Sequence, residues 1–294
     1  MIPDAPEELT LETWGLRLAG LAWGPPTGRP LLALHGWLDN ANSFYNLAPL
    51  LPWARVVALD FPGHGRSEHR GSSAVYHFID WVPDVVAAAD ALGWQRFVLL
   101  GHSMGAGVAA LLAGSCPDMV EALIMVEGLG PYTSPAVDAP SRLATSIAER
   151  RRRAAAVARV PGSRRTREEV VALLCRSVAG LSQDGARILA ERGLRELPEG
   201  GVAWRSDRRL RATSPLRLSE DQVHAFLARI AAPSLLLRAT AGMEAPEALY
   251  RRRVQAIANL RVEEVGGGHH VHLDNAHAVA AAIADFLGIA ADGG

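Results

Sequence analysis

Short apolar runs recur along the chain, and stretches with the composition of helices separate them. Runs of this kind, without alternating polar positions, are typical of strands that are buried on both faces of a parallel sheet. A looser alternation over residues 9–23 predicts two antiparallel edge strands joined as a hairpin. Buried strands are expected at residues 31–34, 56–60, 97–100, 122–126 and 234–237, and a last strand at 262–265.

Helices are predicted between these strands. Asn42 is expected to cap a helix that ends near Leu50, where Pro52 closes it. Strand and helix alternate, and this order indicates right-handed crossovers and a parallel sheet that is covered on both faces. Residues 290–294 are expected to form a frayed tail. The other helices are expected near residues 77–92, 108–113, 247–258 and 275–287.

The pattern changes between residues 130 and 230, where we find no convincing strand and only helical segments broken by glycine and proline. Residues 131–230 hold 19 arginines against 11 acidic residues, although the whole chain has a net charge of −1. We interpret residues 130–230 as a helical cap, or lid, inserted into a core formed by residues 1–129 and 231–294. For most of these arginines a solvated helix surface is the simpler explanation.

Composition narrows the class of protein. The 294 residues are 49% hydrophobic, which allows a large core, and the net charge of −1 does not indicate nucleic-acid binding. Cys116 and Cys175 lie far apart, so neither a disulfide framework nor a metal-binding pair is predicted, and a reducing compartment fits. We find no apolar signal core at the N-terminus and no run near the ~20 apolar residues of a membrane span. We therefore expect a cytoplasmic protein.

Candidate chemistry centres on the run that leaves the strand at 97–100. It reads Gly101-His102-Ser103-Met104-Gly105, a G-x-S-x-G pattern between a buried strand and a helix of small residues. The glycines leave room for a sharp strand-to-helix turn, which exposes the corner serine at the carboxyl end of the sheet. The N-terminus of the helix lies beneath that serine. The pattern therefore predicts a nucleophile elbow with Ser103 as the nucleophile.

A serine hydroxyl needs a positioned base to take its proton and an acid to orient that base. The loop Gly266-Gly267-Gly268-His269-His270-Val271-His272 follows the last strand and so lies at the same sheet edge as Ser103. His269, directly after the glycines, is the predicted base, and His270 and His272 are the alternatives. Three histidines could also bind a metal ion, but no carboxylate at a metal-binding spacing accompanies them. We predict neither a metal nor a cofactor.

Several motifs together resemble the α/β-hydrolase superfamily: the elbow, the pair His35-Gly36, the turn DFPGHGRS at 60–67 and the glycine loop before His269. The longer strings HGWLDNA at 35–41, YHFIDW at 76–81 and EGLGP at 127–131 resemble its serine hydrolase-like branch. This resemblance implies an α/β fold with an eight-stranded, mostly parallel sheet, a helical cap and cofactor-free hydrolysis at Ser103. The related haloalkane dehalogenases and epoxide hydrolases use aspartate as the nucleophile, so Ser103 argues against their reactions.

The sequence departs from the commonest family pattern at the acid. That pattern places an aspartate in the turn after the strand that follows the cap, but residues 238–243 hold no carboxylate before Glu244. Glu127 ends the strand at 122–126, a place where some haloalkane dehalogenases carry their acid. A buried carboxylate needs a partner, and we predict that His269 is the partner of Glu127. Pairing of Glu127 with a cap arginine is the competing explanation, and Glu244 is the alternative acid.

An oxyanion needs preorganised backbone donors, and the N–H groups of Trp37 and Met104 are the candidates. The leading prediction is a carboxylesterase-like serine hydrolase that cleaves a small to medium ester or thioester through an acyl-enzyme at Ser103. One alternative is a carbon–carbon bond hydrolase with the same triad. Another is a ligand-binding, receptor-like protein with little turnover. The expected partner is a small-molecule substrate, and the sequence assigns neither that substrate nor an oligomeric state.

Overall fold

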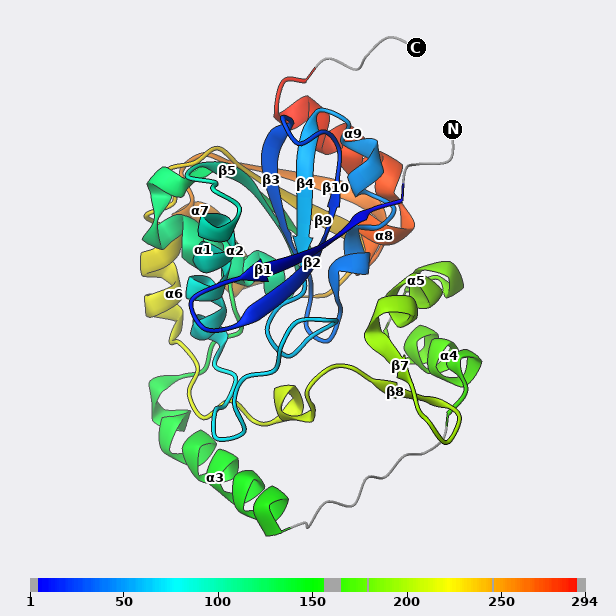
Figure 1. The fold of residues 1–294 in the computed structure, drawn as a ribbon. Helices are drawn as coiled ribbons and strands as arrows, with labels where there is room; N and C mark the ends of the chain where they lie inside the picture. The colour runs from blue at the N-terminus through cyan, green and yellow to red at the C-terminus, as the bar shows by residue number, and fades with distance from the viewer. Residues whose placement is uncertain (1–4, 156–164, 179, 245, 290–294) are drawn as a thin grey trace.

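The computed structural model describes residues 5–155, 165–178, 180–244 and 246–289. An eight-stranded sheet runs through it in the order β1-β2-β4-β3-β5-β6-β9-β10 (Figure 1). The β1–β2 and β2–β4 pairs are antiparallel, and every pair from β4 to β10 is parallel. The strands are β1 (Glu7–Glu12), β2 (Arg17–Trp23), β3 (Arg29–Leu34), β4 (Ala54–Leu59), β5 (Phe97–His102), β6 (Val120–Val126), β9 (Ser234–Ala241) and β10 (Leu260–Gly268).

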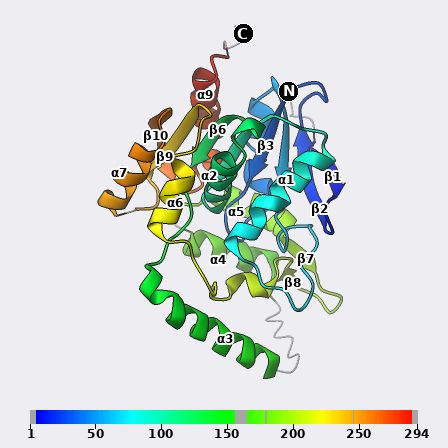
Figure 2. The ribbon, with the colours of Figure 1, turned by 90° about the vertical axis from the view of Figure 1, so that its left-hand side faces the viewer.

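Helices cover both faces of this sheet. Alternate strand residues point to opposite faces, so Leu32 packs in one core and Leu31 in the other. Figure 2 looks onto the first face, which α1 (Trp81–Ala91), α2 (Met104–Ser115), α6 (Glu220–Leu227) and α7 (Glu247–Ala256) cover. The second core lies against α9 (Ala276–Phe286), which follows the short helix α8 (Val271–Asp274).

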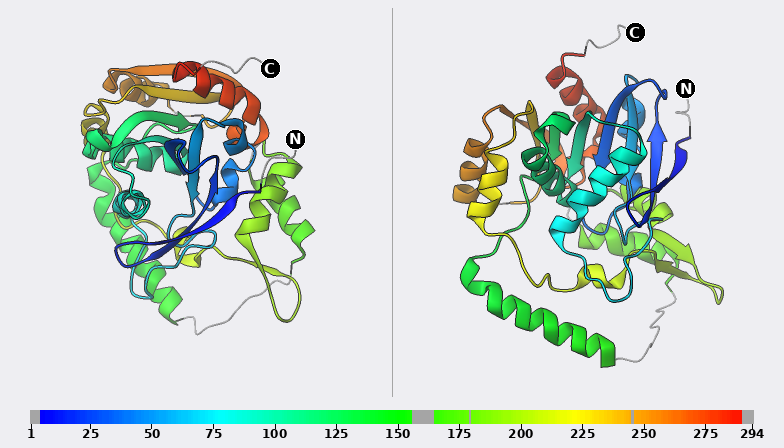
Figure 3. Two further views of the ribbon diagram at one scale, coloured as in Figure 1. Left: turned by 45° about the horizontal axis from the view of Figure 1, so that its top comes forward. Right: turned by 60° about the vertical axis from the view of Figure 1, so that its left-hand side comes forward.

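A long insertion separates β6 from β9, and it packs over the carboxyl ends of the strands. Asn40, in the loop after β3, donates from its side chain to the carbonyl of Leu189 at 2.9 Å. Ser182 donates from its backbone to Asp274, after β10, at 2.9 Å. In Figure 3 the insertion lies beyond the strand ends with α3 outermost. Its elements before α6 are α3 (Ala139–Ala155), α4 (Arg167–Ser177), α5 (Gln183–Gly193), β7 (Leu194–Glu196) and β8 (Val202–Trp204).

The fold-class prediction is confirmed, because the apolar runs form the central strands of a mostly parallel sheet with helices on both faces. The predicted N-terminal hairpin is present as β1 and β2. No helix of the described residues is long and apolar enough to cross a membrane. The division into residues 1–129, 130–230 and 231–294 stays a prediction, and the predicted tail at 290–294 lies outside the described residues.

Two local predictions were wrong. The segment expected to contain no strand holds the hairpin β7–β8, whose three-residue strands are too short to show an alternation. The helix expected between Asn42 and Leu50 is two 3-10 turns, η1 (Ala41–Phe44) and η2 (Ala48–Leu50). Asn40, not Asn42, caps the first turn, and Pro49 lies at the start of the second turn, where its missing N–H prevents a continuous α-helix from the first. The other 3-10 turns are η3 (Phe78–Asp80), η4 (Pro117–Met119), η5 (Ala136–Asp138) and η6 (Arg208–Arg211).

A buried ion pair attaches the insertion to the sheet. Arg192, at the end of α5, is only 2% exposed, and its Nε donates to Asp60 Oδ2 at 2.8 Å. The same guanidinium donates to Glu8 on β1 at 2.8 Å. The fully buried Asp60 carboxylate also accepts from the amides of Ala41 and Arg66. Removing one partner of such a pair leaves an uncompensated charge in the interior.

Arg192→Ala should therefore destabilise the protein by about 3 kcal/mol, because Asp60 would stay buried without its cation. Urea unfolding monitored by circular dichroism measures this loss. The matched control is Arg187→Ala on the same helix, where an exposed pair with Asp184 is removed, and it should change the midpoint far less. Equal shifts of the urea unfolding midpoint in the two variants would contradict an anchoring role for Arg192.

Candidate active site

Ser103 stands at the sharp corner between β5 and α2. Its backbone has φ 51° and ψ −112°, a conformation that side-chain-bearing residues rarely adopt. Its amide donates to the carbonyl of Val126 at 2.9 Å, so the neighbouring strand β6 holds the corner in place. A Cβ on Gly105 would lie 2.0 Å from the carbonyl oxygen of Leu34, which shows how closely α2 approaches β3. These contacts account for the elbow pattern around Ser103.

His269 and Glu127 lie in contact at the same edge of the sheet. His269 Nδ1 is 3.2 Å from Glu127 Oε2. Glu127 directly follows β6, also with a positive φ, 54°. The ring of His269 is centred 4.7 Å from that of His102, the residue before Ser103. The structure thus brings together three segments that are far apart in the sequence and carry the predicted nucleophile, base and acid.

The end of β9 and the turn after it hold the Glu127 carboxylate. The amide of Ala239 donates to Oε1 at 2.6 Å, and the amide of Met243 donates to Oε2 at 2.9 Å. Burial acts to raise the pKa of Glu127, but the bonds from His269 and from these two amides hold that pKa below its usual range. The carboxylate is therefore ionised at neutral pH and bonded to the ring of His269.

This turn is the one that carries an aspartate in the commonest family pattern, and here it supplies backbone donors instead. A Cβ on Gly242 would lie 2.0 Å from Glu127 Oε2, so the carboxylate fills the space beside that glycine. Glu244, the alternative acid, is exposed. The roles of the Ala239 and Met243 amides were not predicted from the sequence, and Gly242, in the stretch without a carboxylate, was the available signal.

The two alternative bases are bonded to other residues. His270 Nε2 lies 3.0 Å from Asp39 Oδ2. His272 Nε2 lies 2.7 Å from Ser43 Oγ, and burial lowers the pKa of His272 well below its usual value. Asp39, His102 and His270 are also the described residues whose side chains could together hold a metal ion, with ligand atoms within 4.8 Å of one another.

The two candidate oxyanion donors follow β3 and the Ser103 corner in the chain. Met104 is the first residue of α2, so its N–H has no acceptor within the helix. Trp37 follows His35 and Gly36, and His35 fixes this turn because its Nδ1 donates to the carbonyl of Gly36 while its Nε2 accepts from the amide of Phe61. The half-exposed indole of Trp37 donates to the carbonyl of Leu210 in the insertion at 3.3 Å. Trp37 thus links the turn to the insertion.

Comparison with known proteins defines the class. Residues 29–276 match the family model described as the alpha/beta hydrolase fold, and the chain belongs to this family. It is 36% identical over 286 residues to the "Serine hydrolase-like protein" of Danio rerio, covering 93% of this chain and 86% of the relative. This relationship supports a hydrolase.

Two solved structures are also similar over nearly their full length. A crystal structure of a hypothetical protein from Pseudomonas aeruginosa PAO1 is 42% identical, with a TM-score of 0.88 over 96% of this chain and 99% of that one. The thioesterase domain from the curacin biosynthetic pathway is 27% identical, with a TM-score of 0.84 over 96% of this chain and 100% of that one. Both confirm the arrangement of sheet and helices.

Gly242→Ala should break the contact between Glu127 and His269. The new methyl group would collide with the carboxylate, and moving the end of that flexible side chain is the cheapest relief. Gly266→Ala is the control, because a Cβ there meets nothing within 4 Å. Crystal structures of both variants measure the distance from His269 Nδ1 to the Glu127 carboxylate. An unchanged distance in Gly242→Ala would contradict the tight fit of the carboxylate in this turn.

Proposed function

We propose that the chain is a serine hydrolase that cleaves a small to medium carboxylic ester or thioester through an acyl-enzyme at Ser103. The observation that carries this proposal is the contact of His269 with Glu127 at the sheet edge where Ser103 forms the strained corner. A base held by an ionised acid at the sheet edge that carries a partly exposed serine is the arrangement that acyl transfer requires.

In this mechanism Ser103 Oγ attacks the carbonyl carbon of the substrate and passes its proton to Nε2 of His269. The N–H groups of Trp37 and Met104 stabilise the oxyanion. The intermediate collapses, and the imidazolium returns the proton to the departing alcohol or thiol. A water molecule, deprotonated by His269, then attacks the acyl-enzyme and releases the acid and free Ser103. Glu127 keeps His269 in the tautomer with the proton on Nδ1 and stabilises the imidazolium.

The insertion serves in this proposal as a cap over the substrate. It contacts the loops after β3 and β10, which carry Trp37 and His269. The ring of Trp37 faces η6 of the insertion, with the guanidinium of Arg211 5.9 Å from the ring centre. The similarity to a thioesterase domain favours thioesters alongside oxygen esters.

Two other functions use the same residues. A carbon–carbon bond hydrolase would need the same nucleophile, base and acid, and a panel of p-nitrophenyl esters with short and long acyl chains separates it from an esterase. A receptor-like protein would keep the fold and the ligand site but turn over little. The ionised, fully bonded Glu127 favours catalysis over the receptor.

Ser103→Ala should reduce ester hydrolysis to the background rate, because it removes the hydroxyl that attacks the substrate, and should leave the melting temperature close to that of the wild type. Labelling by a fluorophosphonate probe should be lost with it. Ser115→Ala, at the far end of the same helix α2, is the control and should keep both ester hydrolysis and labelling by the probe. Substantial activity in purified Ser103→Ala would refute the proposal.

Glu127→Gln should lower kcat by roughly 10⁴, since the neutral amide stabilises neither the imidazolium nor the required tautomer. Glu244→Gln is the matched control and should change the rate little, because Glu244 is exposed. Steady-state kinetics with the best p-nitrophenyl ester measure both variants. The reverse ranking would assign the acid to Glu244 while leaving the roles of Ser103 and His269 in place.

A further inference from the structure

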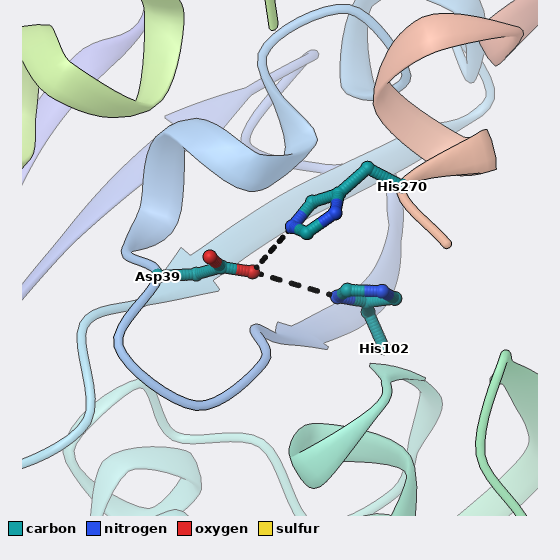
Figure 4. Close-up of side chains that lie close together, drawn as sticks. All are labelled: Asp39, His102 and His270. Carbon is teal, nitrogen blue, oxygen red and sulfur yellow. Dashed lines mark hydrogen bonds and ion pairs between the residues drawn. The ribbon is translucent and has the colours of Figure 1, made fainter. Parts of the chain in front are cut away.

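A second cluster of polar side chains lies directly behind the elbow. Asp39, His102 and His270 come from the loop after β3, the end of β5 and the loop after β10 (Figure 4). One oxygen of Asp39 lies 3.0 Å from His270 Nε2 and 3.6 Å from His102 Nδ1. The side chain of His102 is 1% exposed and that of His270 is 5% exposed. These groups take no part in the proposed hydrolysis.

One ring nitrogen of His102 is aimed into this cluster without a hydrogen-bond partner. The other, Nε2, lies 2.9 Å from the carbonyl oxygen of His269, and since a carbonyl only accepts, Nε2 carries a proton. Nδ1 is buried, lies 3.6 Å from Asp39 Oδ2, and has no hydrogen-bond partner among the described residues. A buried polar atom without a partner needs an explanation, and a metal site supplies one.

His270 presents a second nitrogen to the same oxygen. Its other ring nitrogen, Nδ1, is buried and has no hydrogen-bond partner in the described part of the chain. In the structure the Asp39 carboxylate accepts from Nε2 at 3.0 Å, so Nε2 carries a proton, and a bound metal ion would take the place of that proton, which would go to Nδ1 or to solvent. The three ligand atoms, from Asp39, His102 and His270, lie within 4.8 Å of one another.

Gly36 lies close against these atoms. A Cβ at this position would lie 2.9 Å from Asp39 Oδ2 and 3.0 Å from His102 Nδ1. Two of the three ligand atoms therefore pack against the backbone of this glycine, and a side chain at position 36 would collide with them.

We propose that Asp39, His102 and His270 bind one divalent transition-metal ion of the zinc class. Two imidazoles and a carboxylate are ligands that such ions prefer. Ligand atoms about 2.1 Å from a tetrahedral ion lie about 3.4 Å apart, and the two observed separations, 3.0 and 3.6 Å, bracket this spacing. The bond from His102 to the carbonyl of His269 is the outer contact that a metal-bound imidazole typically makes.

The ion has a structural role in the site and takes no part in the reaction. Its ligands come from the three loops that carry Trp37, Ser103 and His269, so binding fixes those loops relative to one another. The inference does not depend on the proposed hydrolysis, since none of the three ligand side chains takes part in that reaction.

Cobalt(II) is the probe, because its visible absorption reports histidine coordination directly. Wild-type protein is stripped with EDTA, incubated with Co²⁺ and passed through gel filtration. It should then retain one equivalent of Co²⁺ and show the intense visible bands of a four- or five-coordinate ion. Added Zn²⁺ should displace the bound Co²⁺ and remove these bands. At a hundredfold excess over Kd, bound metal should raise the melting temperature by about 4 °C. Folded wild-type protein that retains no Co²⁺ would overturn the proposal.

Variants separate this site from adventitious surface binding. Asp39→Asn and His270→Gln should each fail to retain the equivalent of Co²⁺. His277→Gln, which alters an exposed histidine on α9, should retain it. Retention by both site variants would refute the assignment. If the two site variants fail to fold, an anomalous difference map of Co²⁺-soaked wild-type crystals shows where the ion binds. A peak within about 2.2 Å of the three ligand atoms supports the site, and a peak elsewhere or none at all rejects it.

Discussion

The parallel pairing of β3, β5 and β6 places the ends of these three strands at one level, beside Leu237 within β9, and the site depends on that registration. Leu34 pairs with Gly101, His102 with Val126, and Val126 with Leu237. The chain must turn sharply at this level. Among the described residues, the non-glycine positions with positive φ are Leu38, Ser103 and Glu127, one after each of β3, β5 and β6. Such conformations cost about 1–3 kcal/mol each, and the surrounding sheet holds them.

Charges at this edge are stable because each has several partners. Glu127 accepts from two amides and contacts His269. Asp60 accepts from two amides and from Arg192 of the insertion. In both cases a carboxylate at a strand end organises neighbouring loops, because an unpaired charge in the interior is far more costly than a bonded one. Each of these buried carboxylates therefore holds together segments that are distant in sequence.

Apolar runs and local motifs predicted the central strands, the elbow and the glycine loop, since each depends on a few adjacent residues. The hairpin β7–β8 and the two 3-10 turns escaped prediction because three- and four-residue elements carry too little periodicity. The cluster of Asp39, His102 and His270 escaped for another reason. Its members come from three loops, and only strand order brings them together. The division of the chain into core and cap stays a prediction.

The place of Glu127 has a consequence for how this chain can change over evolution. Ser103 and Glu127 both precede the insertion, within a single strand–helix–strand unit formed by β5, α2 and β6. The chain re-enters the sheet at the start of β9, and the opposite end of that strand supplies main-chain donors and Gly242 beside the acid. Main-chain donors tolerate exchange of the side chains around them. Insertions of different length and composition can therefore be grafted at this point without moving the acid.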